Sequence, residues 1–128
     1  MADVNRGDRP LSPHLTVYRM ELTGMVTSIL TRITGNALIV AALLTVWWLA
    51  AAAVGPDAFA LADGVMRSWF GKLVMLGSIW ALWYHFLAGL RHLYWDSGRG
   101  FELATADRMA WGVYIGSVVL TVVTVVIL

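Results

Sequence analysis

Two histidines and an arginine lie in and beside a long apolar stretch, WALWYHFLAGLRHLYWDSGRG, at residues 80–100. His85 lies within the apolar part, whereas Arg91 and His92 lie where it ends. An ionisable ring is costly in hydrocarbon and therefore needs a partner. On one helix, His85 and His92 share a face about 10.5 Å apart, with Gly89 between them. This spacing allows His85 to bind haem iron while the flat porphyrin lies over Gly89.

The same spacing excludes haem ligation by both histidines. Axial ligands approach the iron from opposite sides of the ring, at a bond length near ~2 Å. The remaining histidine, His14, lies in the N-terminal arm, so the second ligand must come from another polypeptide, either a copy of this chain or a different subunit. Arg91 and His92 would then meet the anionic haem propionates. Alternatively, His85 hydrogen-bonds a neighbouring helix or relays protons, Gly89 serves packing, and Arg91 and His92 are flanking charges.

A second pair of polar residues lies in SILTRITG, at residues 28–35. Ser28 and Arg32 are one helical turn apart on the same face. A hydroxyl and a guanidinium that converge at a membrane boundary are able to hydrogen-bond the carbonyl oxygens of a quinone headgroup. In the simpler interpretation, which the residues alone favour, Ser28 bonds a carbonyl of its own helix and Arg32 extends to lipid phosphate.

The composition indicates the environment of these residues. The chain has 128 residues, of which 59% are hydrophobic and 13% are charged, and it contains seven tryptophans. A soluble domain of this size needs many more polar side chains, so we predict a membrane protein. The absence of cysteine excludes disulfides, thiolate metal sites and iron–sulfur ligation by this chain. The net charge of +1 gives no indication of nucleic-acid binding.

Charged residues divide the chain into uncharged stretches, each close to the ~20 residues that a helix needs to cross a ~30 Å hydrocarbon core. We predict an all-α membrane protein that contributes three transmembrane helices to a heteromeric bundle. The chain forms a single domain (1–128), with an N-terminal arm (1–22) and helices at about 23–54, 69–95 and 107–128.

The connections between the helices contain ordinary helix breakers. Gly55, Pro56 and Gly64 predict a loop with a short amphipathic turn in its middle. Thr105 or Asp107 is expected to cap the third helix.

Orientation and location follow from charge. Seven arginines flank the N-terminal side of the first helix and the second connection, namely Arg6, Arg9, Arg19, Arg32, Arg91, Arg99 and Arg108. Only Arg67 and Lys72 border the first connection. The positive-inside rule thus places the N-terminus in the cytoplasm and the C-terminus in the periplasm. The N-terminal segment MADVNRGDRP is neither a secretory signal nor a transit peptide, which favours a bacterial inner membrane.

The order of RPLSPHLTVYR, SILTRITG and YHFLAGLRHLYWD, in a three-helix chain of this length, resembles the cytochrome b556 subunits of succinate dehydrogenase, the larger membrane anchors of respiratory complex II. The resemblance runs from Arg9 to Asp96. It implies a complex with a flavoprotein that oxidises succinate, an iron–sulfur protein and a second small membrane anchor. The two anchors would share haem b and shape a ubiquinone site.

The resemblance also implies roles for individual residues. His85 becomes the axial haem ligand, with the opposite ligand on the partner anchor. His92 and Arg32 match positions near the propionates, and Ser28 and Arg32 match the quinone pocket. Thr31 departs from the family pattern, because many relatives have histidine there. A hydroxyl can donate a hydrogen bond but carries no charge, so no haem or proton role is assigned to Thr31.

The expected function is therefore electron transfer from the iron–sulfur subunit to ubiquinone, in the respiratory chain and the tricarboxylic acid cycle. This chain has no catalytic residues for succinate oxidation, and we expect no activity from it without its partners. Two alternatives stay open at the level of sequence. One is the anchor of a menaquinone-linked fumarate reductase, and the other is a small haem-free transporter or structural membrane subunit.

Overall fold

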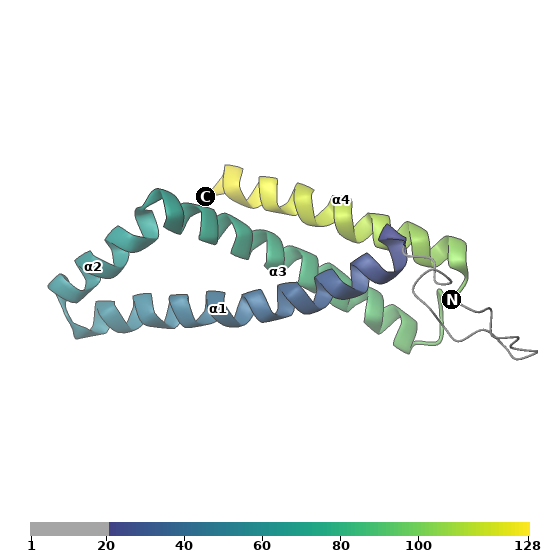
Figure 1. The fold of residues 1–128 in the computed structure, drawn as a ribbon, viewed down its shortest axis with the longest axis horizontal. Helices are drawn as coiled ribbons and strands as arrows, with labels where there is room; N and C mark the ends of the chain where they lie inside the picture. Colours follow the sequence, from purple (N-terminus) through teal and green to yellow (C-terminus); the bar gives the residue numbers. More distant parts are fainter. Residues whose placement is uncertain (1–20) are drawn as a thin grey trace, which may run out of the picture.

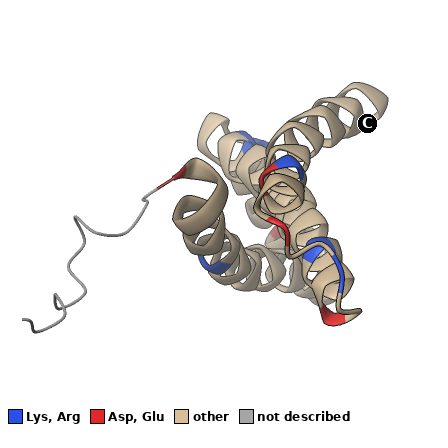
Figure 2. Cartoon of the chain, turned by 90° about the vertical axis from the view of Figure 1, so that its right-hand side faces the viewer, with Lys and Arg blue, Asp and Glu red and all other residues tan. Residues whose placement is uncertain are grey.

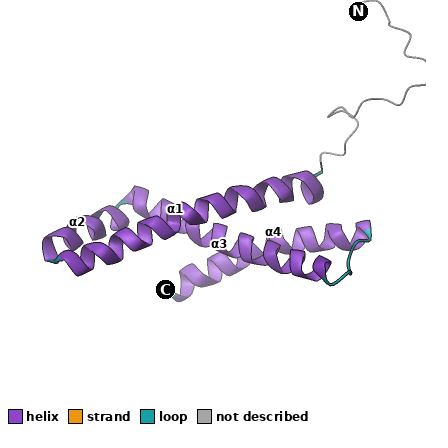
Figure 3. Cartoon of the chain, turned by 90° about the horizontal axis from the view of Figure 1, so that it is seen from below, coloured by secondary structure: helices purple, strands orange, loops and turns teal. Residues whose placement is uncertain are grey.

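The computed structural model describes residues 21–128 and is built from helices (Figure 1). A π-helical turn, η1 (Leu22–Val26), leads into the first long helix. The α-helices are α1 (Thr27–Val54), α2 (Pro56–Arg67), α3 (Trp69–Asp96) and α4 (Leu103–Ile127). Residues 21–128 contain no strand (Figure 3), which confirms the expected all-α class. His14 and most of the N-terminal arm lie outside the described residues, so the expectations for them are not tested.

Three helices have the length and composition of membrane spans: Leu22–Val54, Trp69–Asp96 and Leu103–Ile127. At about 1.5 Å per residue, each is long enough to cross a ~30 Å core. The outer surfaces carry many exposed apolar side chains, among them Leu43, Leu82 and Val122. Such a surface suits lipid contact and would be unusual in water.

Two helix boundaries differ from the sequence expectations. The third membrane span begins at Leu103, about one turn earlier than predicted, because Glu102 takes the N-cap position. Thr105 and Asp107 therefore lie inside α4 and do not cap it. The expected amphipathic turn is a full helix, α2, of 12 residues. Pro56 occupies its first turn, where the missing N–H costs nothing.

The α1–α2 and α2–α3 junctions are tight. Gly55 has a φ of 149°, a conformation that side-chain-bearing residues rarely adopt. Ser68 ends α2 and caps α3, because its Oγ accepts a hydrogen bond from the Gly71 amide at 3.0 Å. Phe59 of α2 packs against Trp48 of α1, with ring centroids 5.5 Å apart. These contacts fold α2 back against α1 and α3 at one end of the molecule (Figure 1).

Helix α3 lies between α1 and α4 and packs against both (Figure 1). The buried centre consists of Tyr84, Ala88 and Val113. Gly116 permits a close approach, since a Cβ there would lie 2.9 Å from the Leu87 side chain. Small residues at such contacts are typical of helix packing in membranes, where dispersion and hydrogen bonds hold helices together.

Tyrosine and tryptophan hydrogen bonds join the helices at two levels. Tyr114 of α4 donates to the Leu22 carbonyl oxygen at 2.7 Å, and Tyr84 of α3 donates to the Thr27 carbonyl oxygen at 3.3 Å. These bonds join the start of the first span to α4 and α3. Nearer the other end, Trp83 Nε1 donates to Thr124 Oγ1 at 2.9 Å, which joins α3 to α4.

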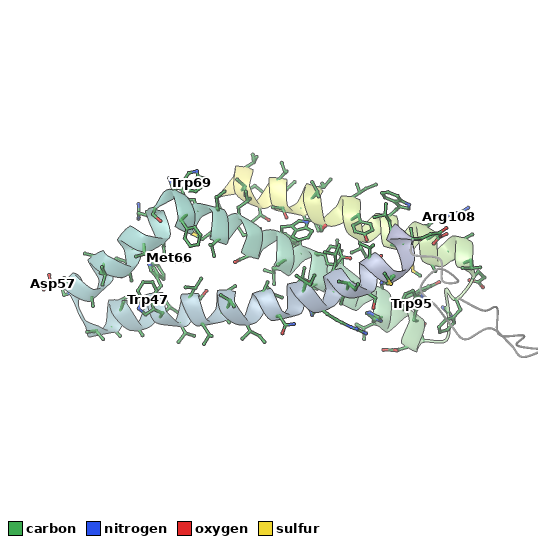
Figure 4. All side chains as sticks on the ribbon, in the orientation of Figure 1. Trp47, Asp57, Met66, Trp69, Trp95 and Arg108 are labelled. Atoms are coloured by element: carbon green, nitrogen blue, oxygen red, sulfur yellow. The ribbon has the colours of Figure 1, made fainter. Side chains whose placement is uncertain are left out.

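Within residues 21–128, the two ends of the molecule differ in the number of charged residues that they carry. The end that holds the start of the first span and the α3–α4 connection carries Lys/Arg and Asp/Glu residues of several elements (Figure 2). Trp95 and Arg108 mark this end in Figure 4, and Trp47, Asp57 and Trp69 mark the other. Tryptophans near both ends are typical of membrane–water interfaces.

Candidate functional site

A cavity of about 480 Å³ opens at the end of the molecule where α1, α3 and α4 come together. It lies at the Trp95 end of Figure 4. The residues that line it come from the start of the first span, the last turns of α3 and the first turns of α4. They are Glu21, Thr23, Gly24, Ser28, Thr31, Arg32, Arg91, His92, Trp95, Leu103, Ala106 and Asp107. The structure thus brings together Ser28, Arg32, Arg91 and His92, which sequence spacing had assigned to two separate groups.

The Ser28 hydroxyl is available at the cavity wall. Its neighbours Thr27, Thr31 and Thr34 each donate to a carbonyl oxygen of the first span. Ser28 makes no such bond, and within residues 21–128 it has no hydrogen-bond partner. The simpler interpretation, in which Ser28 bonds back to its own helix, is therefore not what the structure has. Arg32 is exposed on the same face and lines the same cavity.

Arg91 is the most unusual charge in the cavity wall. Arg91 is only 7% exposed. Its Cζ lies 4.6 Å from the centroid of the Trp95 ring. The Nε and Nη1 atoms are buried and have no hydrogen-bond partner among the described residues. A buried guanidinium without an anion is costly, so this position is suited to a negatively charged group from outside the described residues.

His92 lies next to Arg91 on the cavity side of α3. Its ring is exposed and meets Trp95 edge to face, with centroids 5.3 Å apart. Arg91, His92 and Trp95 are neighbours on one helical face, because residues three and four apart meet there. The Arg91 guanidinium and the His92 imidazole therefore line the same cavity at the boundary of the membrane span.

His85 lies two turns deeper in α3 and does not line this cavity. Its Nδ1 is 3.1 Å from the Thr31 carbonyl oxygen and 3.3 Å from Thr34 Oγ1. A carbonyl oxygen only accepts, so the proton of the neutral ring is on Nδ1 and the Nε2 lone pair is left for a metal. A hydrogen bond from the other ring nitrogen to a backbone carbonyl is the usual way to orient a metal-binding histidine.

Thr31 connects the two parts of the site. Its backbone carbonyl accepts from His85, and the residue also lines the cavity with Ser28 and Arg32. Its hydroxyl donates to the Thr27 carbonyl oxygen at 2.8 Å. Thr31, to which the sequence assigned no haem or proton role, therefore contributes to the site through its backbone.

Gly35 is a site residue that sequence reasoning missed. A Cβ at this position would lie 3.0 Å from His85 Cε1, so the ring rests against the bare α1 backbone. Gly35 is the last residue of SILTRITG and lies one helical turn beyond Thr31. A glycine inside a predicted helix can indicate a close contact, but no role was assigned to this one. Gly89, which was expected beneath the porphyrin, has nothing within 4 Å of its Cβ position. The space there is open, and its role stays a prediction.

No group of three or more His, Cys, Asp and Glu side chains within residues 21–128 has the arrangement of a metal site. An iron atom bound by His85 would therefore take its remaining ligands from groups other than these described side chains.

The chain matches known proteins over most of its length. The family model described as "Succinate dehydrogenase/Fumarate reductase transmembrane subunit" matches residues 5–124. The succinate dehydrogenase cytochrome b556 subunit of Paracoccus denitrificans is 57% identical over 127 residues, covering 99% of this chain and 97% of the relative. The protein of the same name from Rickettsia conorii is 39% identical and covers 89% and 88%. The cytochrome b560 subunit of Reclinomonas americana is 35% identical and covers 75% and 69%.

Fold and cavity define a helical membrane subunit with a polar site at one boundary of its spans. The matches to nearly the whole chain then show that it belongs to the family of succinate dehydrogenase/fumarate reductase transmembrane subunits. The sequence resemblance and the expected role as a membrane anchor of succinate dehydrogenase are confirmed.

Proposed function

We propose that this chain assembles with a flavoprotein, an iron–sulfur protein and a second small membrane anchor, and that it helps to pass electrons to ubiquinone. Family membership supports the enzyme and its soluble subunits. The observation that carries the site assignment is the single cavity that unites Ser28, Arg32, Arg91 and His92. Its volume of about 480 Å³ lies in the ~300–1,000 Å³ range of small-molecule sites.

The residues around His85 fit haem b. His85 Nε2 has a free lone pair because Nδ1 is held by the Thr31 carbonyl oxygen at 3.1 Å. The buried, unpartnered Nε and Nη1 of Arg91 fit a carboxylate such as a haem propionate. His92 and Arg32 are the other propionate candidates, and the second protein ligand of the iron would come from the partner anchor. When bound, haem b would supply one-electron redox chemistry between the two anchors.

Ser28 and Arg32 are the quinone-binding residues of the proposal. The Ser28 hydroxyl donates a hydrogen bond to a quinone carbonyl oxygen, and the Arg32 guanidinium donates to the same end of the ring. As electrons from the iron–sulfur subunit reduce the quinone, negative charge develops on that oxygen. A guanidinium held at that oxygen stabilises this charge until a proton arrives. Reduction to ubiquinol takes up two electrons and two protons.

We assign this end of the molecule to the cytoplasmic side of a bacterial inner membrane. Arg32, Arg91, Arg99 and Arg108 flank the spans at this end, whereas Arg67 and Lys72 flank them at the other. By the positive-inside rule, the N-terminus is cytoplasmic and the C-terminus periplasmic. Protons for quinol formation would then come from the cytoplasm, and membrane lipid would surround the apolar outer faces.

The test is gentle purification of the tagged chain from membranes that express the native subunits. We expect a b-type haem signal in the reduced-minus-oxidised absorbance spectrum, together with a flavoprotein, an iron–sulfur protein and a second anchor. Succinate should reduce ubiquinone in this sample. A colourless chain without these partners would contradict the proposal, and a preference for menaquinone with fumarate as acceptor would assign the chain to a fumarate reductase.

A further inference from the structure

Trp95 lies at the point where α3, the α3–α4 connection and the cavity meet. No role followed for it from the sequence beyond that of an interfacial aromatic residue. In the structure it makes three specific contacts at once. Its ring meets the Arg91 guanidinium at 4.6 Å, its edge packs with His92, and its Nε1 donates to the Gly100 carbonyl oxygen at 3.0 Å.

The hydrogen bond to Gly100 fixes the indole on the side of the connection. Gly100 has a φ of 78° and is buried, and a Cβ there would lie 2.5 Å from Tyr94 Cε1. The backbone is therefore restricted to glycine at the residue that accepts from Trp95. An indole held at its N–H by this backbone has little freedom to rotate away from Arg91.

The ring contact matters because no hydrogen bond or ion pair with another described residue holds the buried Arg91 side chain. Its Nε and Nη1 are buried and unpartnered in the described part of the chain, so no hydrogen bond from these atoms fixes the orientation of the guanidinium. Attraction between a cation and the face of an indole strengthens when both are removed from water. Trp95 is thus the contact that holds the plane of the guanidinium at the cavity wall.

We propose that Trp95 is a positioning residue, which holds the Arg91 guanidinium in place to receive an anionic carboxylate of the prosthetic group. The inference rests on the proposed function, because it takes the partner of Arg91 to be a haem propionate. Trp95 acts on that group only through Arg91. The hydrogen bond from Trp95 to the Gly100 carbonyl oxygen holds the indole ring in place, and the ring in turn positions the Arg91 guanidinium.

A merely structural role for Trp95 makes a different prediction. Trp83 also donates an indole hydrogen bond, to Thr124 Oγ1 of α4 at 2.9 Å, but it contacts neither Arg91 nor the cavity. Trp83 therefore serves as the matched control. If Trp95 only tethered two helices, replacing either tryptophan would have similar effects.

The experiment is a redox titration of haem in the assembled four-subunit complex, followed by absorbance. A guanidinium beside a propionate offsets negative charge near the iron and favours the reduced state. We expect Arg91→Leu to lower the midpoint potential. Trp95→Leu should reproduce at least half of that shift, and the double variant should shift no further than Arg91→Leu alone. Trp83→Phe should leave the potential unchanged.

A second variant keeps the test sharp if Trp95→Leu does not assemble. Trp95→Phe keeps a ring face for Arg91 but removes the N–H donor that holds the ring, so we expect a shift in potential smaller than that of Trp95→Leu. A shift in Trp95→Phe equal to that of Arg91→Leu would overturn the role of the ring. So would additive shifts in the double variant, or an equal shift in Trp83→Phe.

The outcomes also separate this inference from the function on which it rests. If Arg91→Leu shifts the potential and Trp95→Leu does not, the positioning role alone is wrong. If Arg91→Leu leaves the potential unchanged, the proposed propionate contact is wrong, and the role of Trp95 with it.

Discussion

His85 Nδ1 lies 3.1 Å from the carbonyl oxygen of Thr31, so the deepest histidine of α3 is tied to the backbone of α1. This bond selects the tautomer of the ring and leaves Nε2 without a hydrogen. It also means that the orientation of a metal ligand on one helix depends on how closely a second helix approaches. The close approach is possible because Gly35 has no side chain beside the ring.

Replacement of Gly35 by alanine should disturb the haem site without removing any ligand. The new Cβ would lie 3.0 Å from His85 Cε1, so the ring must move by a few tenths of an ångström. Small-to-large changes in packed sites cost about 1–3 kcal/mol. We expect a lower haem content per complex and an altered haem spectrum, both measured by absorbance.

Gly112→Ala is the control for Gly35→Ala. A Cβ at Gly112 has nothing within 4 Å, and both substitutions favour the helix equally. A Gly35→Ala complex with the haem content and spectrum of the Gly112→Ala complex would show that the His85 ring does not depend on this contact.

Ser28→Ala should impair quinone reduction and leave haem in place. A neutral hydrogen bond contributes about 0.5–1.5 kcal/mol, which corresponds to a rise of roughly 2- to 12-fold in the apparent KM for ubiquinone. The measurement is steady-state succinate:ubiquinone reductase activity of the complex, with the haem spectrum recorded on the same sample.

Ser78→Ala controls for loss of a serine hydroxyl from the same chain. Ser78 donates to the Val74 carbonyl oxygen at 2.7 Å and does not line the cavity. Equal KM values in the two variants would assign Ser28 to packing alone.

Tyr114→Phe should loosen the start of the first membrane span. It removes the 2.7 Å hydrogen bond to the Leu22 carbonyl oxygen and the 3.3 Å contact with Thr27 Oγ1. We expect a loss of about 1 kcal/mol in stability, seen as a lower thermal unfolding midpoint of the complex. Tyr94→Phe, at an exposed tyrosine of α3, should leave the midpoint unchanged. If both variants unfolded at the wild-type temperature, the hydrogen bond from Tyr114 to the Leu22 carbonyl oxygen would not contribute to stability.

The sequence was sufficient for the membrane spans and for much of the polar site. Long uncharged stretches specify spanning helices almost by themselves, because the bilayer leaves few alternatives for the backbone. Ser28 and Arg91 lie at the same end because the first and second spans run in opposite directions. Residues near the start of one helix therefore meet those near the end of the next.

Other features were not accessible from one sequence. The Thr31 carbonyl has no side-chain signature, and the contact between Gly35 and His85 depends on the rotation of two helices about their axes. Trp95 was indistinguishable from the other tryptophans near helix ends. Helix α2 was expected as a loop because Gly55 and Pro56 are common breakers, although a proline in the first turn also starts helices.

The central claim, that His85 binds haem iron, is tested most directly by the reduced-minus-oxidised spectrum of His85→Ala beside His92→Ala. Both variants lose an imidazole from α3, but only His85 has its Nδ1 held by the Thr31 carbonyl oxygen. With flavoprotein content used to normalise for assembly, we predict that His85→Ala loses or alters the b-type signal and that His92→Ala retains it. An unchanged haem spectrum in His85→Ala would contradict the claim.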